Sequence, residues 1–215
     1  MARATSAIKY LTGKRPPTPQ GVNVVFGGDS YLKKMVLTRL THLILPGNDA
    51  EFSLTRIDVE KDTWADVLDV LATQSLFGDG KRLVILEDAD DFVKQNRGSI
   101  EDYAKAIVTA GSLVLTVNTW SKSTRLYKEL EKTGLQIDCS VPKPAELVSW
   151  LQHRANESDD FKLPSDSARE MIDLLGCESG LLDQELKKML LTFDSKTPLT
   201  PAEIQNRIGG WRTKK

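Results

Sequence analysis

The chain has 215 residues, enough for one large domain or for a medium domain and a small one. A hydrophobic share of 40% and a charged share of 27% are ordinary for a globular protein, and the net charge of −1 favours neither nucleic acid nor an anionic membrane as partner. The sequence contains no bilayer-length apolar run and no signal-peptide pattern, and its two cysteines and two histidines form no metal-binding spacing. We therefore expect a cytoplasmic protein that needs no metal and no membrane.

The first two thirds of the sequence alternates apolar runs with helix-length segments. A helix is expected from Asp29 or Ser30 to about Leu45, and others near 62–77 and 123–132. A further helix is expected to start at Ser99, which forms a capping-box pattern with Asp102, and to end at Gly111. The expected strands are 22–26, 52–58, 83–86, 113–117 and 135–139. Five strands separated by helices predict an α/β domain with a parallel sheet covered on both faces.

The pattern changes at the proline-rich segment 141–144, after which only helices are expected. Pro144 suits the first turn of one helix, Ser165 starts another that Gly176 ends, and Leu182 belongs to a third. Thr200 and Glu203 form a capping box for a fourth helix. The sequence therefore predicts a basic lead-in at 1–20, an α/β domain at 21–140, a small helical domain at 141–209 and a linker at 210–215.

The segment 62–77 carries the strongest functional signal. Trp64, Val67, Leu68 and Leu71 form one apolar helix face, and a helix continued beyond them places Leu76 and Phe77 about 130° away from that face. Two large apolar groups off the buried face suggest a contact offered to another protein. The alternative is a helix that stops near Thr73, so that the pair folds back into the core.

The segment after the first strand occupies the place of a phosphate-binding loop. The loop needs the pattern G-x-x-x-x-G-K-[ST], in which glycine amides bind phosphates, lysine neutralises them and a hydroxyl holds Mg²⁺. Gly27 and Gly28 begin the match and Lys33 occupies the lysine position, but Leu32 replaces the second glycine and Lys34 replaces the hydroxyl. We therefore expect no nucleotide binding at these residues.

Carboxylates follow the apolar run 83–86, in the form of a Walker B segment that holds Mg²⁺. Glu87 and Asp88 are the residues that would bind the metal. The alternative is that Glu87, Asp88, Asp90 and Asp91 are a solvated strand end, which the broken phosphate loop favours. No GxSxG elbow occurs, and two distant histidines supply no base for a catalytic triad, so no catalytic residue is nominated.

Several stretches in order resemble the delta subunit of bacterial DNA polymerase III, the clamp-loader protein that opens the sliding clamp. The stretches lie at 25–32, 64–78, 81–87, 124–130, 134–139, 146–151 and 183–188. The resemblance implies an AAA+-like domain with a degenerate nucleotide site, followed by a helical lid. It also implies that Leu76 and Phe77 enter a hydrophobic pocket on the clamp, and Gln74-Ser75-Leu76-Phe77 is similar to the core of clamp-binding peptides.

The resemblance implies a set of partners as well. These are the sliding clamp (the beta subunit), the gamma/tau and delta prime subunits of the loader, and primed DNA within the assembled loader only. Delta subunits carry a third, collar domain, and the sequence stops where that domain is expected to begin. Two other functions remain open: an active ATPase with an atypical phosphate loop, and a DNA-binding adaptor that uses the basic N-terminal stretch and the Lys/Arg-rich end of the sequence.

Overall fold

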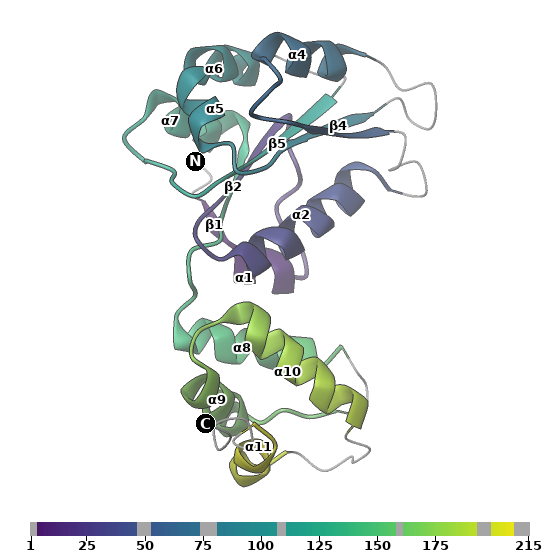
Figure 1. Cartoon of the computed structure of the whole chain (residues 1–215), viewed down its shortest axis with the longest axis vertical. Helices are drawn as coiled ribbons and strands as arrows, with labels where there is room; N and C mark the ends of the chain where they lie inside the picture. Colours follow the sequence, from purple (N-terminus) through teal and green to yellow (C-terminus); the bar gives the residue numbers. More distant parts are fainter. Residues whose placement is uncertain are drawn as a thin grey trace. The chain divides into compact units, whose positions relative to one another are not determined.

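A computed structural model of the chain describes residues 4–46, 53–73, 81–106, 111–157, 161–192 and 199–208. The chain divides into two compact units, Met1–Ser140 and Val141–Lys215, and each is described by itself. The first unit is a parallel sheet between two layers of helices, and the described part of the second unit contains helices (Figure 1).

The first unit confirms the predicted fold class. All strand pairs among the described residues are parallel, and the strands lie in the order β1-β6-β2-β5-β4-β3. Their bounds are Thr5–Ser6 for β1, Val22–Phe26 for β2, Leu54–Ile57 for β3, Arg82–Leu86 for β4, Gly111–Val117 for β5 and Leu135–Asp138 for β6. The central strands β2, β4 and β5 are almost wholly buried, as expected for apolar runs covered on both faces.

In the described part of the chain the sheet has six strands, one more than the sequence predicts. The additional strand is β1, in which Thr5 and Ser6 pair with Ile137 and Asp138 of β6. The Ser6 side chain then accepts a hydrogen bond from the Lys9 amide and caps helix α1 (Ala7–Thr12). A two-residue strand is too short to show alternation, so the sequence pattern of the predicted basic lead-in could not reveal it.

Helices cover the two faces of the sheet as separate layers (Figure 1). One layer contains α1 and α2 (Ser30–Ile44), which pack against each other. The other contains α4 (Trp64–Ala72), α5 (Asp90–Gln95), α6 (Arg97–Lys105) and α7 (Arg125–Thr133). On this side the apolar core joins alternate residues of the strands to side chains of the four helices, among them Val24, Leu115, Val67, Ile100 and Leu126.

The predicted start and end of the helix near Ser99 are wrong. Helix α6 begins at Arg97, because the Ile100 amide donates to the Asn96 carbonyl directly after α5 ends, so Ser99 lies inside the helix. Burial of Ile100 against the sheet fixes this earlier start. Gly111 begins strand β5 instead of ending the helix, and a Cβ at this position would lie 3.0 Å from the Leu71 carbonyl oxygen.

The second unit contains the four expected helices: α8 (Pro144–Ala155), α9 (Ser165–Leu175), α10 (Ser179–Thr192) and α11 (Pro201–Ile208). Gly176 ends α9 with a φ of 79°, a conformation that favours glycine. The Glu203 carboxylate accepts hydrogen bonds from the Thr200 amide and hydroxyl, which confirms the predicted capping box. A buried ion pair between Arg154 and Asp183, with Nε and Oδ1 2.8 Å apart, joins α8 to α10.

Candidate functional site

Most of the candidate site residues lie where three parallel strands end. The carboxyl ends of β2, β4 and β5 lead into Gly27, Glu87 and Asn118 respectively, so their side chains and loops meet at one edge of the sheet. Parallel α/β sheets bind their ligands at this edge. The polar groups found there decide whether a nucleotide fits.

The predicted phosphate loop directs its amides at the protein itself. The Gly27 amide donates to the Val117 carbonyl at 3.2 Å, and the Asp29 amide donates to the Cys139 carbonyl at 2.9 Å. Gly27 has a φ of 123°, and a Cβ there would lie 2.3 Å from the backbone of Cys139. Close packing on the segment after β6 therefore accounts for this glycine without any ligand.

Asp29 occupies the position at the start of α2 where a phosphate would bind. Its carboxylate accepts a hydrogen bond from the Leu32 amide at 2.9 Å and caps the helix. A bound phosphate would meet this negative charge at the helix end that normally attracts anions. Leu32, which replaces the second glycine of the motif, is fully buried in the core.

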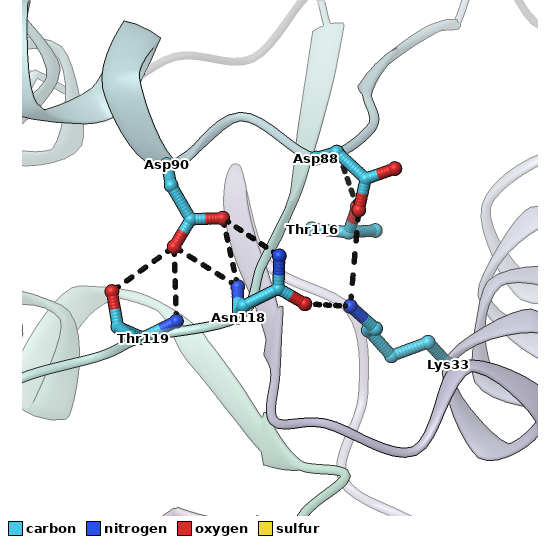
Figure 2. A network of polar contacts seen from close by, with 6 residues as sticks. All are labelled: Lys33, Asp88, Asp90, Thr116, Asn118 and Thr119. Carbon is cyan, nitrogen blue, oxygen red and sulfur yellow. Dashed lines mark hydrogen bonds and ion pairs between the residues drawn. The ribbon is translucent and has the colours of Figure 1, made fainter.

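Lys33 is the centre of a polar network at this edge (Figure 2). The residue is only 8% exposed, and its Nζ atom lies 2.8 Å from Asn118 Oδ1 and 3.9 Å from Asp88 Oδ1. The Asp88 amide donates to Thr116 Oγ1 at 2.9 Å, and Asp88 has a φ of 50°. A lysine that would neutralise phosphates in a working loop is here bonded to side chains that follow β4 and β5.

Asp90 ties the same network to the start of α5 (Figure 2). Its carboxylate accepts bonds from the Asn118 amide and side chain at 2.9 and 3.2 Å, and from the Thr119 amide and hydroxyl at 3.0 Å each. Burial alone would raise the pKa of Asp90, but the hydrogen bonds from Asn118 and Thr119 outweigh it and lower the pKa. The carboxylate is therefore ionised and held by the protein.

The predicted metal ligands are only partly brought together. Asp88 joins the Lys33 network, whereas Glu87 forms an ion pair with Arg56 of β3. Neither prediction for this segment describes Asp90. The residue was expected at a solvated strand end, but its carboxylate is the main hydrogen-bond acceptor of the network. The sequence signal that could have found Asn118 and Thr119 is their place directly after the buried strand β5.

The residues at this edge do not fit a Mg²⁺-nucleotide. A hollow of about 650 Å³ lies beside them and is lined by α2 residues, by Arg56 and by Glu87, so space is not the obstacle. The obstacle is chemical: two loop amides, the helix cap and the lysine are all bonded within the protein. Binding a nucleotide would require these bonds to break.

The second predicted site lies at the end of α4. Val67 and Leu71 are buried, and the helix ends at Ala72 because Thr73 adopts an extended conformation while its amide and hydroxyl bond to the Asp69 carbonyl. The helix therefore ends where the alternative prediction places its end, and the expectation of a continued helix that carries Leu76 and Phe77 about 130° away from the apolar face is wrong. Gln74, Ser75, Leu76 and Phe77 themselves lie outside the described residues, and so does the predicted linker at 210–215.

Comparison with known proteins identifies the family. The model of the DNA polymerase III delta subunit family matches residues 24–140, more than half of the chain. The chain belongs to this family. The match includes both candidate sites, the carboxyl edge of the sheet and the segment after α4.

Solved structures support the fold. The Bacillus subtilis DNA clamp loader delta protein (YqeN) is similar with a TM-score of 0.69 at 18% identity, over 87% of this chain and 58% of that one. The Thermotoga maritima RuvB Holliday junction branch migration motor is similar with a TM-score of 0.51 at 11% identity, over 95% of this chain and 65% of that one. The chain thus spans less than two thirds of each of these structures. No curated protein is significantly similar in sequence.

The sequence predicts no segment long and apolar enough to span a membrane. In the described part of the chain, no helix combines the length and the apolar character needed to cross a bilayer.

Proposed function

We propose that this delta-family chain binds and opens the ring-shaped DNA sliding clamp through Leu76 and Phe77. The observation that carries the proposal is the position of this pair: it comes four residues after the end of α4 at Ala72 and lies inside the region 24–140 that matches the delta subunit family. Gln74 and Ser75 precede the pair and supply polar groups beside it.

The core contacts of α4 are made by residues of the helix itself. The helix places Val67 and Leu71 in the core, and Trp64 contacts Tyr103 edge to face with ring centroids 5.8 Å apart. These contacts complete the apolar face of α4 before Thr73 ends the helix. Because α4 ends where the core alternative also expects its end, the proposal rests on the family match and on the order of the residues, and the variant below decides between a clamp contact and a core contact.

The energy of the contact comes from burial in the partner. Burying a leucine and a phenylalanine contributes roughly 1.5–3 kcal/mol each before ordering costs, and a few such anchors commonly carry most of an interface. The clamp ring opens if the chain binds the open interface more tightly than the closed one, because a partner shifts an equilibrium only through differential affinity.

ATP acts through other subunits in this proposal. The chain itself neither binds nor hydrolyses nucleotide, since Lys33 and Asp29 already have partners at the carboxyl edge. The gamma/tau and delta prime subunits would then control when the clamp-binding surface is accessible. The rival function, an active ATPase, requires binding of Mg-ATP by the isolated chain, which calorimetry measures directly.

The test compares the 215-residue chain with its Leu76→Ala/Phe77→Ala variant in binding to the sliding clamp. We expect the affinity to fall about 100-fold, as the loss of roughly 3 kcal/mol predicts, with an unchanged thermal midpoint. The matched control is Leu43→Ala/Leu191→Ala, which removes two exposed leucines elsewhere and should bind the clamp normally.

Two outcomes would count against the proposal. Unchanged clamp affinity in the Leu76→Ala/Phe77→Ala variant would remove the pair from the interface. A thermal midpoint lowered by several degrees in that variant alone would show that the pair is part of the core.

A further inference from the structure

Helix α4 and strand β4 come together at the amino edge of the sheet, opposite to the carboxyl edge. Arg82 begins β4, and its Nε atom donates to the Thr73 carbonyl at 3.1 Å, directly after α4 ends. Gly111 begins β5, and a Cβ there would lie 3.0 Å from the Leu71 carbonyl oxygen, so the end of α4 also packs closely on β5. The described residues on either side of the segment 74–80 are therefore held at one place.

A hollow of about 420 Å³ at this amino edge carries positive charge. Lys81, Arg82, Ser112, the segment 18–21 and the end of α2 line it, and none of the described lining residues is an acid. Lys81 is exposed and pairs with no acid of the described residues. The sequence 73–82 contains two cations and one acid, Asp79, so this part of the chain is net positive.

One wall of the hollow is fixed by the buried side chain of Asn23. This side chain accepts a hydrogen bond from the Gln20 amide at 2.8 Å and donates to the carbonyls of Gln20 and Leu113 at 2.8 and 3.2 Å. The Leu113 amide donates in turn to the Gly21 carbonyl at 2.8 Å. The segment 18–21 is thus tied to β2 and β5, and the cations border a surface that is formed before any partner binds.

The length of the chain keeps the amino edge close to any contact made by Leu76 and Phe77. Phe77 is four positions before Lys81 and Leu76 is three positions after Thr73, so the two Cα–Cα distances are at most roughly 14 and 11 Å. A standard interface covers about 800 Å² on each partner, which is a patch of roughly 16 Å radius. A partner centred on the pair therefore covers or borders Lys81.

We propose that the sliding clamp presents carboxylates to Lys81 and Arg82, and that these cations steer the chain to the clamp. The inference rests on the proposed function, because it takes the clamp as the partner of Leu76 and Phe77. Charges at the border of an interface mainly raise the association rate and make it depend on salt, whereas buried anchors mainly set the dissociation rate. The cations and the apolar pair therefore have separate kinetic roles.

The cations define the chemistry of this contact. Phosphates of a nucleic acid would also pair with Lys81 and Arg82, but they would offer no apolar pocket to Leu76 and Phe77. The exposed Leu43 lines the hollow from α2, in the helix layer on the other face of the sheet from α4 (Figure 1), and is not part of the proposed contact.

The test measures the association and dissociation rates of the 215-residue chain with the immobilised sliding clamp, at about 20 mM and about 500 mM salt, where screening is weak and strong respectively. Lys81→Glu should lower the association rate about five- to tenfold at the lower salt and less than about twofold at the higher salt, with little change in the dissociation rate. Lys81→Arg keeps the charge and should behave like the native chain.

The matched control is Lys94→Glu, at an exposed residue of α5, which follows the carboxyl end of β4. Each glutamate variant removes one positive charge and adds one negative charge, so both change the net charge of the chain from −1 to −3. The control should keep an association rate close to that of the native chain, because its charge lies beyond the opposite edge of the sheet.

Equal association rates for Lys81→Glu and Lys94→Glu, or a loss in Lys81→Glu that does not depend on salt, would overturn the inference and leave the clamp contact of Leu76 and Phe77 in place. A weaker binding of Lys81→Glu to an immobilised DNA duplex, with unchanged association to the clamp, would assign the cations to nucleic acid instead. Absence of clamp binding by the native chain would overturn the proposed function and this inference together, so the two failures are distinguishable.

Discussion

The carboxyl edge of the sheet and the basic turn, which consists of the exposed cations Lys9, Lys14 and Arg15, are two polar regions of the first unit. They differ in whether their side chains are bonded to other groups of the protein. At the carboxyl edge, Lys33, Asp29 and Asp90 are all bonded to other groups of the protein. In the basic turn, Lys14 and Arg15 are exposed, and no acid of the described residues pairs with them. Bonds of the first kind contribute to the stability of the fold, whereas exposed cations without such bonds contribute little to it.

The comparison shows that the place of a polar group in the fold and the bonds that it makes are separate kinds of evidence about its role. The carboxyl edge has the location of a nucleotide site, yet the groups that would meet a nucleotide there are bonded within the protein. Lys14 and Arg15 follow the short helix α1 outside any recognised motif, and no acid of the described residues pairs with them. The position of a polar group in the fold is therefore a weaker guide to ligand binding than the hydrogen bonds and ion pairs that the group already makes within the protein.

The largest effect on stability should come from Asp90→Ala. The substitution removes a charged acceptor of hydrogen bonds from Asn118 and Thr119, so we expect the free energy of unfolding to fall by about 3 kcal/mol. Asp91→Ala is the control, because Asp91 is the exposed neighbour in the same helix. Urea unfolding measures both, and equal losses in the two variants would contradict a structural role for Asp90.

A somewhat smaller effect is expected for Lys33→Met. Methionine keeps an apolar stem of similar length but leaves Asn118 Oδ1 without its donor, so we expect a loss of about 2 kcal/mol in the free energy of unfolding. Lys34→Met changes the exposed neighbouring lysine and should be close to neutral. A Lys33→Met variant as stable as the Lys34→Met control would show that the network is not needed for the fold.

The pH dependence of stability should identify Asp90 as a contributor. The pKa of Asp90 is lowered in the folded chain below its ordinary value of 3.8. Its contribution is therefore complete above that value and is lost as the pH falls through the lower, folded pKa. The stability difference between the native chain and Asp90→Asn should be largest near neutral pH and shrink between about pH 5 and pH 2. A difference that grows with acid would contradict this assignment.

The smallest effect on stability belongs to the basic turn. Because Lys14 and Arg15 are exposed and form no ion pair with a described acid, Lys14→Ala/Arg15→Ala should change the free energy of unfolding by less than about 0.5 kcal/mol. Thermal unfolding at low and high salt provides the measurement. A loss comparable to that of Lys33→Met would place these cations among the structural groups and remove the contrast between the two regions.

The sequence predicted the regular parts of the fold well. Buried strands such as Val22–Phe26 and Arg82–Leu86 are continuous apolar runs, and the cap at Asp29 and the proline at Pro144 define helix starts through local chemistry. The predictions failed where local signals are weak or misleading. Strand β1 has two residues, and the capping pattern at Ser99 lies inside a helix whose start depends on the burial of Ile100.

The position of the candidate site was predicted from the sequence, but its hydrogen bonds and ion pairs were not. The sequence shows that Leu32 and Lys34 break the phosphate-loop motif, because the motif is a contiguous pattern. It does not show that Asn118 accepts a bond from Lys33, because these residues are 85 positions apart and meet only through the order of the strands. The clamp contact at Leu76 and Phe77 lies outside the described residues and stays a prediction.

The most direct test of the account measures the affinity of the 215-residue chain for the sliding clamp with and without Mg-ATP. The account predicts binding with the same Kd in both conditions, because the proposed contact lies at Leu76 and Phe77, and Asp29 and Lys33 at the carboxyl edge are already bonded within the protein. Absence of binding, or a Kd that changes severalfold when Mg-ATP is added, would contradict it.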